Sequence, residues 1–149
     1  MEDYKDEVTV LNTLQANLQQ AHQIVWGLHW SMSGKGFLAT HPFLDDPLDE
    51  IHEMVDWVAE RTVQVGGVPV DSYEDVLKLA SHASIESRMY EIGNAVSGLI
   101  TAFTQLGEDL RAARKGLSPE DTATASQIDG YIGDIDKYTW MLQKEGEVF

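Results

Sequence analysis

The sequence predicts an all-α protein: a bundle of four long helices, with one short extra helix in the connection between helices two and three. Apolar residues recur at steps of three and four over long stretches, and alternating patterns typical of β-strands are weak throughout. Glycine and proline interrupt the helical stretches at only a few places. With 149 residues and 43% hydrophobic side chains, the chain has the size of a single domain, residues 1–149, with one core.

The first two predicted helices occupy the N-terminal half. The first covers about residues 5–32, where six apolar residues share one face: Leu11, Leu14, Leu18, Ala21, Val25 and Leu28. Asp46 followed by Pro47 marks the start of the second helix, because aspartate caps a helix N-terminus and proline suits the first helical position. This second helix ends at Gly66-Gly67.

The remaining helices follow a long connection. Residues 71–80 predict a short helix inside this connection, and residues 84–115 predict the third bundle helix. Ser118 as the cap and Pro119 at the first position start a fourth helix that reaches about Lys144. One long connection between the second and third helices is typical of the ferritin-like four-helix bundle.

Composition limits the classes of function. The chain has no cysteine, so a bound metal would need oxygen and imidazole ligands, which leaves iron, manganese and zinc as candidates. A net charge of −15 attracts cations and repels nucleic acid and anionic lipid. No apolar run reaches the roughly 18–20 residues of a membrane span, and the start MEDYKDEV is acidic where a signal peptide is basic. We therefore expect a cytoplasmic protein.

Two histidines and a run of carboxylates form the most informative pattern. His29 and His41 bracket the stretch HWSMSGKGFLATH, and a strip about 80° wide on the second helix follows. The strip contains Asp45, Asp49, His52, Asp56 and Glu60. Taken alone, an acidic pair such as Asp56 and Glu60 is more often part of a solvated surface. A lone histidine more often packs against its neighbours and makes an ordinary hydrogen bond. Together, imidazoles and carboxylates within 32 residues favour a metal site, and Fe(II) in particular.

One motif of larger di-iron bundles is missing. Those centres use a Glu-x-x-His motif from each of two helices, and this chain contains none. Asp56 and Glu60 stand one turn apart and can share a cation or a pair of cations. A site shared between subunits would supply the missing ligands.

At these positions the sequence resembles the Dps family (DNA-binding proteins from starved cells, or miniferritins). The resemblance rests on HWSMSGKGFLATH, DWVAERTVQVGGVPV and DIDKYTWML. It implies a bacterial dodecameric shell that oxidises Fe(II), preferably with hydrogen peroxide but also with oxygen, and stores ferric oxide. It also implies ferroxidase centres at two-fold interfaces, with five metal ligands: His29, His41 and Asp45 from one subunit, and Asp56 and Glu60 from the other.

Other residues are candidates for electron transfer and for iron entry, the second role being what the resemblance implies. Trp30, beside the first histidine, is a candidate electron donor, although an aromatic residue there more often packs. Glu120, Asp121 and Asp129 are candidates for lining a three-fold pore, but helix capping alone also favours an acidic first turn.

Three further residues lie on the outer side of the second helix. His52 is either a partner of the metal ligands or, as we favour, a surface histidine. Met54 and Trp57 are predicted to point away from the core stripe, which favours a role for both in subunit contact.

DNA binding is not expected. Many family members bind DNA through a tail rich in lysine or arginine, whereas this sequence begins MEDYKDEV and ends KEGEVF. We therefore expect neither direct DNA binding nor association with the nucleoid, and only a cation-bridged association with DNA at low salt stays open. Two alternatives to a ferroxidase stay open: a nucleoid-associated or structural shell without turnover, and a helical bundle whose acidic strip is only solvated.

Overall fold

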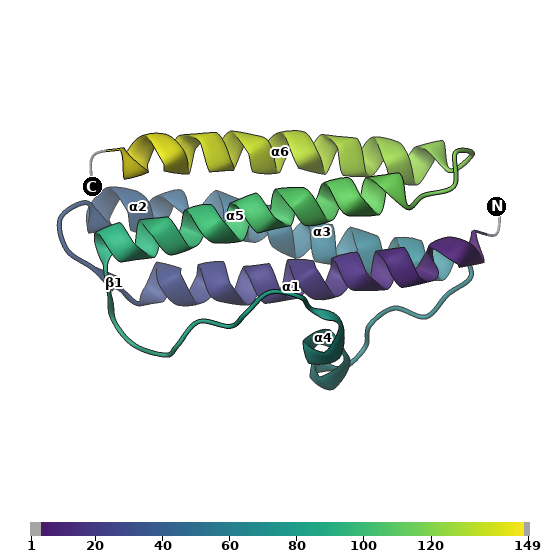
Figure 1. Ribbon diagram of the computed structural model, residues 1–149, viewed down its shortest axis with the longest axis horizontal. Coiled ribbons are helices and arrows are strands. Elements are labelled where there is room, and N and C mark those ends of the chain that lie inside the picture. The colour runs from purple at the N-terminus through teal and green to yellow at the C-terminus, as the bar shows by residue number, and fades with distance from the viewer. Residues whose placement is uncertain (1–3, 148–149) are drawn as a thin grey trace.

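The structure is a computed structural model that describes residues 4–147. In this part of the chain four long helices lie side by side as a bundle (Figure 1). They are α1 (Val8–Trp30), α3 (Asp45–Gln64), α5 (Ile92–Lys115) and α6 (Thr122–Gly146). The shorter elements are a 3-10 turn (Lys5–Glu7), α2 (Phe37–Phe43), α4 (Tyr73–Leu79) and the strands β1 (Met32–Ser33) and β2 (Tyr90–Glu91). The predicted all-α bundle with a short helix in its central connection is confirmed.

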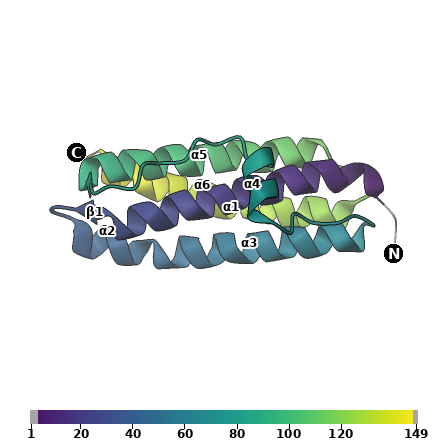
Figure 2. The same cartoon turned by 90° about the horizontal axis from the view of Figure 1, so that it is seen from below.

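The connection between α3 and α5 runs along the length of the bundle, so that these two helices point in the same direction (Figure 1). The short helix α4 lies in the middle of this connection and packs against α1 (Figure 2). At its end, β2 pairs in parallel with β1, with Met32 opposite Tyr90. This topology is the one-crossover arrangement of ferritin-like bundles.

The core lies between the four long helices. α1 packs against α3 and α5, and α6 packs mainly against α5. The predicted stripe of α1 is buried, and Phe103 of α5 is among the largest side chains that are fully buried. Each such side chain contributes about 1.5–3 kcal/mol relative to its exposed state. No helix in the described range is long and apolar enough to cross a membrane.

The helix α2 was not predicted, because the sequence indicated no helix between about residue 32 and Asp46. Gly36 precedes it with φ = 103°, a left-handed conformation that glycine adopts without strain. Phe37 then packs against the core, and Pro42 falls in the last turn. The two glycines and the proline concealed this helix, which carries His41.

The third bundle helix starts later than predicted, at Ile92 rather than near residue 84. Side chains of α1 bind the preceding segment in place of helical hydrogen bonds. Asn17 accepts a hydrogen bond from the backbone N–H of Ser81, at 2.9 Å, and the Gln20 amide donates to the Ser84 hydroxyl, at 3.0 Å. Ile85 still packs against the core, which explains why its spacing resembled a continuing helix.

Two other details differ from the prediction. α6 begins at Thr122, because Asp121 is the N-cap and accepts a hydrogen bond from the backbone N–H of Thr124, at 3.2 Å. The subunit-contact prediction for Met54 is wrong, because this side chain is 1% exposed and lies in the core. Trp57 is partly buried, and its ring meets Tyr131 of α6 edge-on. α3 packs on two neighbours, so its buried face is wider than one stripe.

Candidate metal centre

The first group of predicted ligands lies where α1, α2 and α3 meet. His29 closes α1, His41 is on α2 and Asp45 begins α3. The two imidazole rings stack with their centres 3.8 Å apart and their planes 10° from parallel. The Nε2 atom of His29 lies 3.8 Å from a carboxylate oxygen of Asp45. The structure therefore brings these three residues together.

Hydrogen bonding defines which nitrogen of each histidine can bind a ligand. The Nδ1 atom of His41 lies 2.8 Å from the backbone carbonyl oxygen of His29. A carbonyl oxygen only accepts, so Nδ1 of a neutral His41 carries the proton and Nε2 keeps its lone pair. In His29, Nδ1 is buried without a hydrogen-bond partner in the described chain, and Nε2 faces Asp45. Each ring thus offers Nε2 to a metal.

The electrostatics of this group favour neutral imidazole. Burial lowers the pKa of His29, and the neighbouring His41 lowers it further. His29 is therefore neutral at pH 7, which is the form that binds metals. The Asp45 side chain is 67% exposed and can turn towards a ligand outside the chain.

The second group of predicted ligands lies further along α3. Asp56 and Glu60 are both exposed and stand one turn apart. A hydrogen bond with Asp56, together with its negative charge, raises the pKa of the Glu60 carboxyl. Both line a groove of about 480 Å³ between α3 and α6, which Tyr131 and Asp134 also line. A cation placed between the two carboxylates would remove their repulsion.

The two groups do not meet within one chain. Asp45 and Asp56 are separated along α3 by about 16 Å at the helical rise of 1.5 Å per residue. Among residues 4–147, no three histidine or acidic side chains lie close enough to hold a metal ion. The predicted ligands therefore lie in two separate groups, here called half-sites: one with two imidazoles and a carboxylate, the other with two carboxylates.

Trp30, the candidate electron donor, follows His29 directly and is 53% exposed. Its ring centre lies 4.4 Å from that of Trp26, one turn earlier on α1. Trp30 is thus not a core residue of the single chain, and the two indoles form an exposed aromatic surface beside the first half-site.

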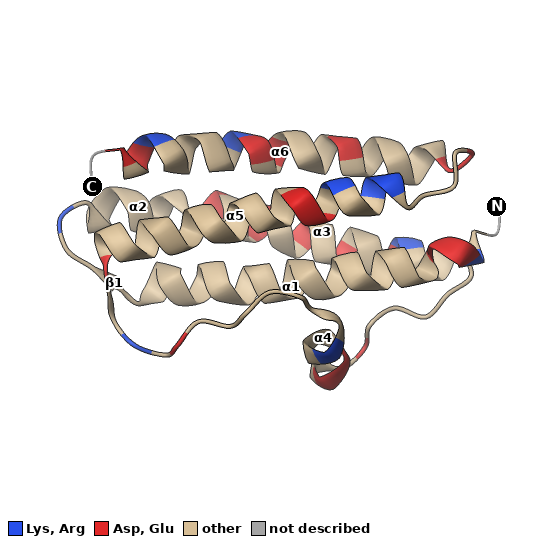
Figure 3. Ribbon diagram, in the orientation of Figure 1, with Lys and Arg blue, Asp and Glu red and all other residues tan. Residues whose placement is uncertain are grey.

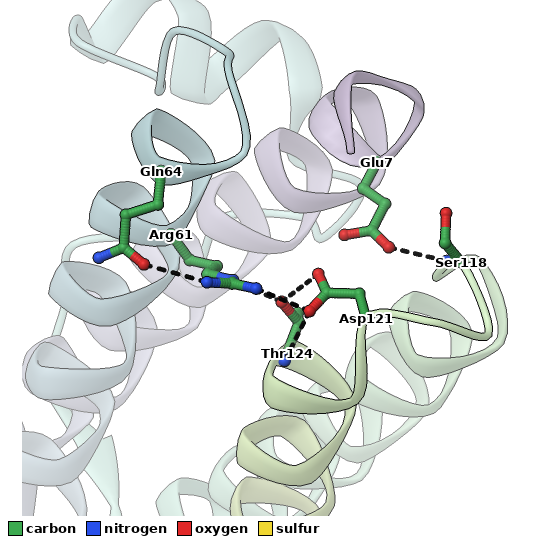
Figure 4. A network of polar contacts seen from close by, with 6 residues as sticks. All are labelled: Glu7, Arg61, Gln64, Ser118, Asp121 and Thr124. Carbon is green, nitrogen blue, oxygen red and sulfur yellow. Dashed lines mark hydrogen bonds and ion pairs between the residues drawn. The ribbon is translucent and has the colours of Figure 1, made fainter. Parts of the chain in front are cut away.

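The three pore candidates lie in different environments. Glu120 is exposed, and Asp129 is exposed and pairs with Arg114, at 2.8 Å. Asp121, in contrast, is 2% exposed and accepts a hydrogen bond from Arg61, at 2.7 Å (Figure 4). Its carboxylate is therefore engaged in joining α3 to α6, and only the other two present exposed carboxylates.

The network around Asp121 was not evident in the sequence. Arg61 also donates to the hydroxyl of Thr124, at 2.7 Å, and the buried Glu7 accepts from the backbone N–H of Ser118, at 2.7 Å (Figure 4). Burial raises the pKa of Glu7 to about 7, and the nearby Asp121 adds to this effect. The network joins residues far apart in the sequence, so local spacing carries no signal for it.

The fold indicates a class of protein, and the comparisons with known proteins agree with it. Residues 8–147 match a family model described as "Ferritin-like domain". A DNA protection during starvation protein of Streptococcus suis is 29% identical over 148 residues, covering 94% of this chain and 83% of the relative. One of Deinococcus radiodurans is also 29% identical, covering 93% of this chain and 69% of the relative. The chain is therefore a ferritin-like protein.

Solved structures narrow the class. Dps from Staphylococcus aureus superposes with a TM-score of 0.88 and 25% identity over 98% of both chains. Dps from Listeria innocua gives a TM-score of 0.85 and 27% identity, covering 93% of this chain and 94% of that chain. A Dps structure from Vibrio cholerae gives a TM-score of 0.84 and 26% identity, and the match covers 93% of this chain and 87% of that chain. That protein is described as a member of a superfamily of ferritin-like diiron-carboxylate proteins. The chain belongs to the Dps family.

Proposed function

We propose that this protein is a ferroxidase miniferritin. It oxidises Fe(II), preferably with hydrogen peroxide and also with oxygen, and stores the ferric product inside a dodecameric shell. Membership in a family of ferritin-like diiron-carboxylate relatives supports iron storage and oxidative protection in general terms. The observation that carries the finer proposal is that each chain presents two complementary half-sites and no complete one in its described part.

A two-fold interface would complete the site. In a two-fold contact each subunit presents the same surface, so the histidine half of one chain meets the acidic half of the other, twice per dimer. His29, His41 and Asp45 would then face Asp56 and Glu60 of the second copy. The two imidazoles are neutral ligands, whereas the carboxylates supply negative charge for two divalent ions, with Glu60 placed to bridge them.

The pairing of two ions explains the protective chemistry. Two Fe(II) ions give up one electron each and reduce one hydrogen peroxide, with two protons, to two water molecules. A single Fe(II) ion gives only one electron, and this leaves hydroxide and a hydroxyl radical. A site that binds its iron substrate in pairs therefore consumes peroxide without releasing the radical.

Charge supports delivery of the iron. The chain has a net charge of −15, and acidic residues occur along the length of α6 (Figure 3). Such a surface raises the local concentration of Fe(II). The same charge opposes phosphate, so we do not extend to this chain the DNA protection that the relatives' names describe. Zinc or manganese could compete for the same ligands.

The test measures peroxide consumption after Fe(II) is added to the assembled protein. We expect one peroxide consumed per two Fe(II), and a loss of at least about tenfold in the initial rate for His29→Ala and for Glu60→Ala, because each removes a metal ligand. Glu74→Ala, in the exposed helix α4, is the matched acidic control and should keep the rate. Unchanged oxidation in both ligand variants would contradict the proposal and favour a shell without turnover.

A further inference from the structure

Two histidines outside the proposed ferroxidase ligands approach each other on the α1–α3 face. The ring centres of His22 and His52 lie 6.1 Å apart. His22 is half-buried, and Trp26 meets the edge of its ring at 5.3 Å. His52 is exposed and lies in the same strip of α3 as Asp45, Asp56 and Glu60. Periodicity alone gave no reason to single out His22, because the pair forms only when α1 packs on α3.

The proposed two-fold contact would place His52 close to a symmetry axis. If Asp45 of one chain meets Asp56 and Glu60 of a second copy, the α3 helices run antiparallel across the contact. The symmetry axis then crosses α3 midway between the two half-sites, at about residues 50–53. Within that turn Ile51 is buried, and His52 belongs to the strip that faces the partner. In such a contact His52 would meet the same residue of the second copy near the axis.

We propose that His22 and His52 of two subunits together form a four-imidazole site for a divalent transition metal such as zinc on the dimer axis. This inference rests on the proposed function, because it uses the same two-fold contact. At 1.5 Å per residue, His52 lies about 10 Å along α3 from Asp45 and about 12 Å from Glu60, so the site is distinct from the iron-oxidising centres.

The geometry of the pair suits one shared ion. Rings bound to one tetrahedral zinc ion have centres about 5–6 Å apart, because each Zn–N bond is about 2.0–2.1 Å. The observed 6.1 Å needs only a small rotation of the exposed His52 side chain. Packing limits the movement of the His22 ring, because its centre lies 5.3 Å from that of the Trp26 ring.

The ligand type also fits. Four neutral nitrogens form a closed set for zinc and suit copper or nickel as well, whereas iron oxidation needs open positions. The nearby carboxylate of Asp49 supplies countercharge without being a required ligand. A metal here would join two α1–α3 pairs across the seam, so the site would link dimer stability to metal supply.

Equilibrium dialysis of the assembled protein against zinc sulfate tests the site. The protein used carries His29→Ala and Glu60→Ala, so that the ferroxidase ligands do not contribute. We expect one tightly bound zinc per two chains. Adding His52→Ala, or His22→Ala, should weaken zinc binding by more than about 100-fold. The loss of a residue that only hydrogen-bonds to a metal ligand already lowers metal affinity by about 10–100-fold, and these variants remove the ligand itself. Gln23→Ala, next to His22 and exposed, should leave it unchanged.

Several outcomes separate this inference from the proposed function. One zinc per chain, or binding that survives His52→Ala, would overturn the shared site. A second outcome is that the dialysis protein, which carries His29→Ala and Glu60→Ala, binds no zinc on the axis while the wild-type protein still consumes peroxide through its ferroxidase ligands. In that case the four-imidazole site fails and the proposed function stands. If the chains sediment as monomers, the two-fold contact and the proposed function both fail. In zinc-soaked crystals, an anomalous peak on the two-fold axis beside His52 is the expected result.

Discussion

Replacing Arg61 with alanine tests the buried network that joins α3, α6 and the start of α1. The guanidinium donates to Asp121 and Thr124, both at 2.7 Å, and its side chain is 12% exposed. The Asp121 side chain is 1% exposed. Arg61→Ala would leave the Asp121 carboxylate buried beside Glu7 without the guanidinium that pairs with it.

The expected cost follows from the remaining contacts. Removing one partner of a buried ion pair costs about 3–5 kcal/mol. Asp121 keeps its bonds from the Thr124 hydroxyl, at 2.6 Å, and backbone, at 3.2 Å, so the lower end, about 3 kcal/mol, applies. For a chain of this size each kcal/mol lowers Tm by about 2–4 °C, so the expected loss is about 6–12 °C.

Thermal unfolding followed by circular dichroism measures this loss, at equal protein concentration because assembly contributes to Tm. The matched control is Arg88→Ala, whose ion pair with Glu86 at 3.4 Å is exposed and is worth about 0–1 kcal/mol. A loss below about 1 kcal/mol for Arg61→Ala, or one equal to the control, would refute the reasoning that this buried pair holds the bundle end together.

Three further predictions concern pH, packing and electron transfer. Folding raises the pKa of Glu7 from 4.5 to about 7, so between these values the folded protein binds a proton that the unfolded chain has lost. The free energy of unfolding should therefore fall as pH rises from about 5 to 8. Glu7→Gln should flatten this pH dependence, measured by urea unfolding at each pH. Gly67→Ala places a Cβ 2.4 Å from a methyl of Val8 and should cost about 1–3 kcal/mol in urea unfolding, whereas Gly130→Ala, with nothing within 4 Å, should not destabilise. Trp30→Phe should raise the hydroxyl-radical yield in spin trapping when Fe(II) and peroxide are mixed; an unchanged yield would remove the electron-donor role.

Much of the fold could be predicted because local signals agreed with the packing. The α1 stripe, the glycine pair after α3 and the short α4 all lie where spacing and capping placed them. Errors arose where tertiary contacts replaced local ones. Asn17 and Gln20 bind the segment before α5, and Arg61 of α3 binds Asp121, the cap that precedes the start of α6 at Thr122.

The site could be predicted only as a set of residues. Spacing showed that Asp56 and Glu60 share one face, and the structure adds that His29 and His41 stack. The helix α2 that orients His41 was missed. The complete site that we propose needs a second copy of the chain, and no periodicity within one sequence encodes the register of such a contact.

Mixing two inactive variants gives the most direct measurement of a shared centre. His29→Ala and Glu60→Ala subunits are unfolded together, reassembled at equal ratio and assayed for peroxide-dependent Fe(II) oxidation. In a mixed dimer one site loses both ligands and the other keeps all five, so random pairing restores about a quarter of the wild-type activity. Activity no higher than that of the separately reassembled variants would show that the histidines and carboxylates do not meet across subunits.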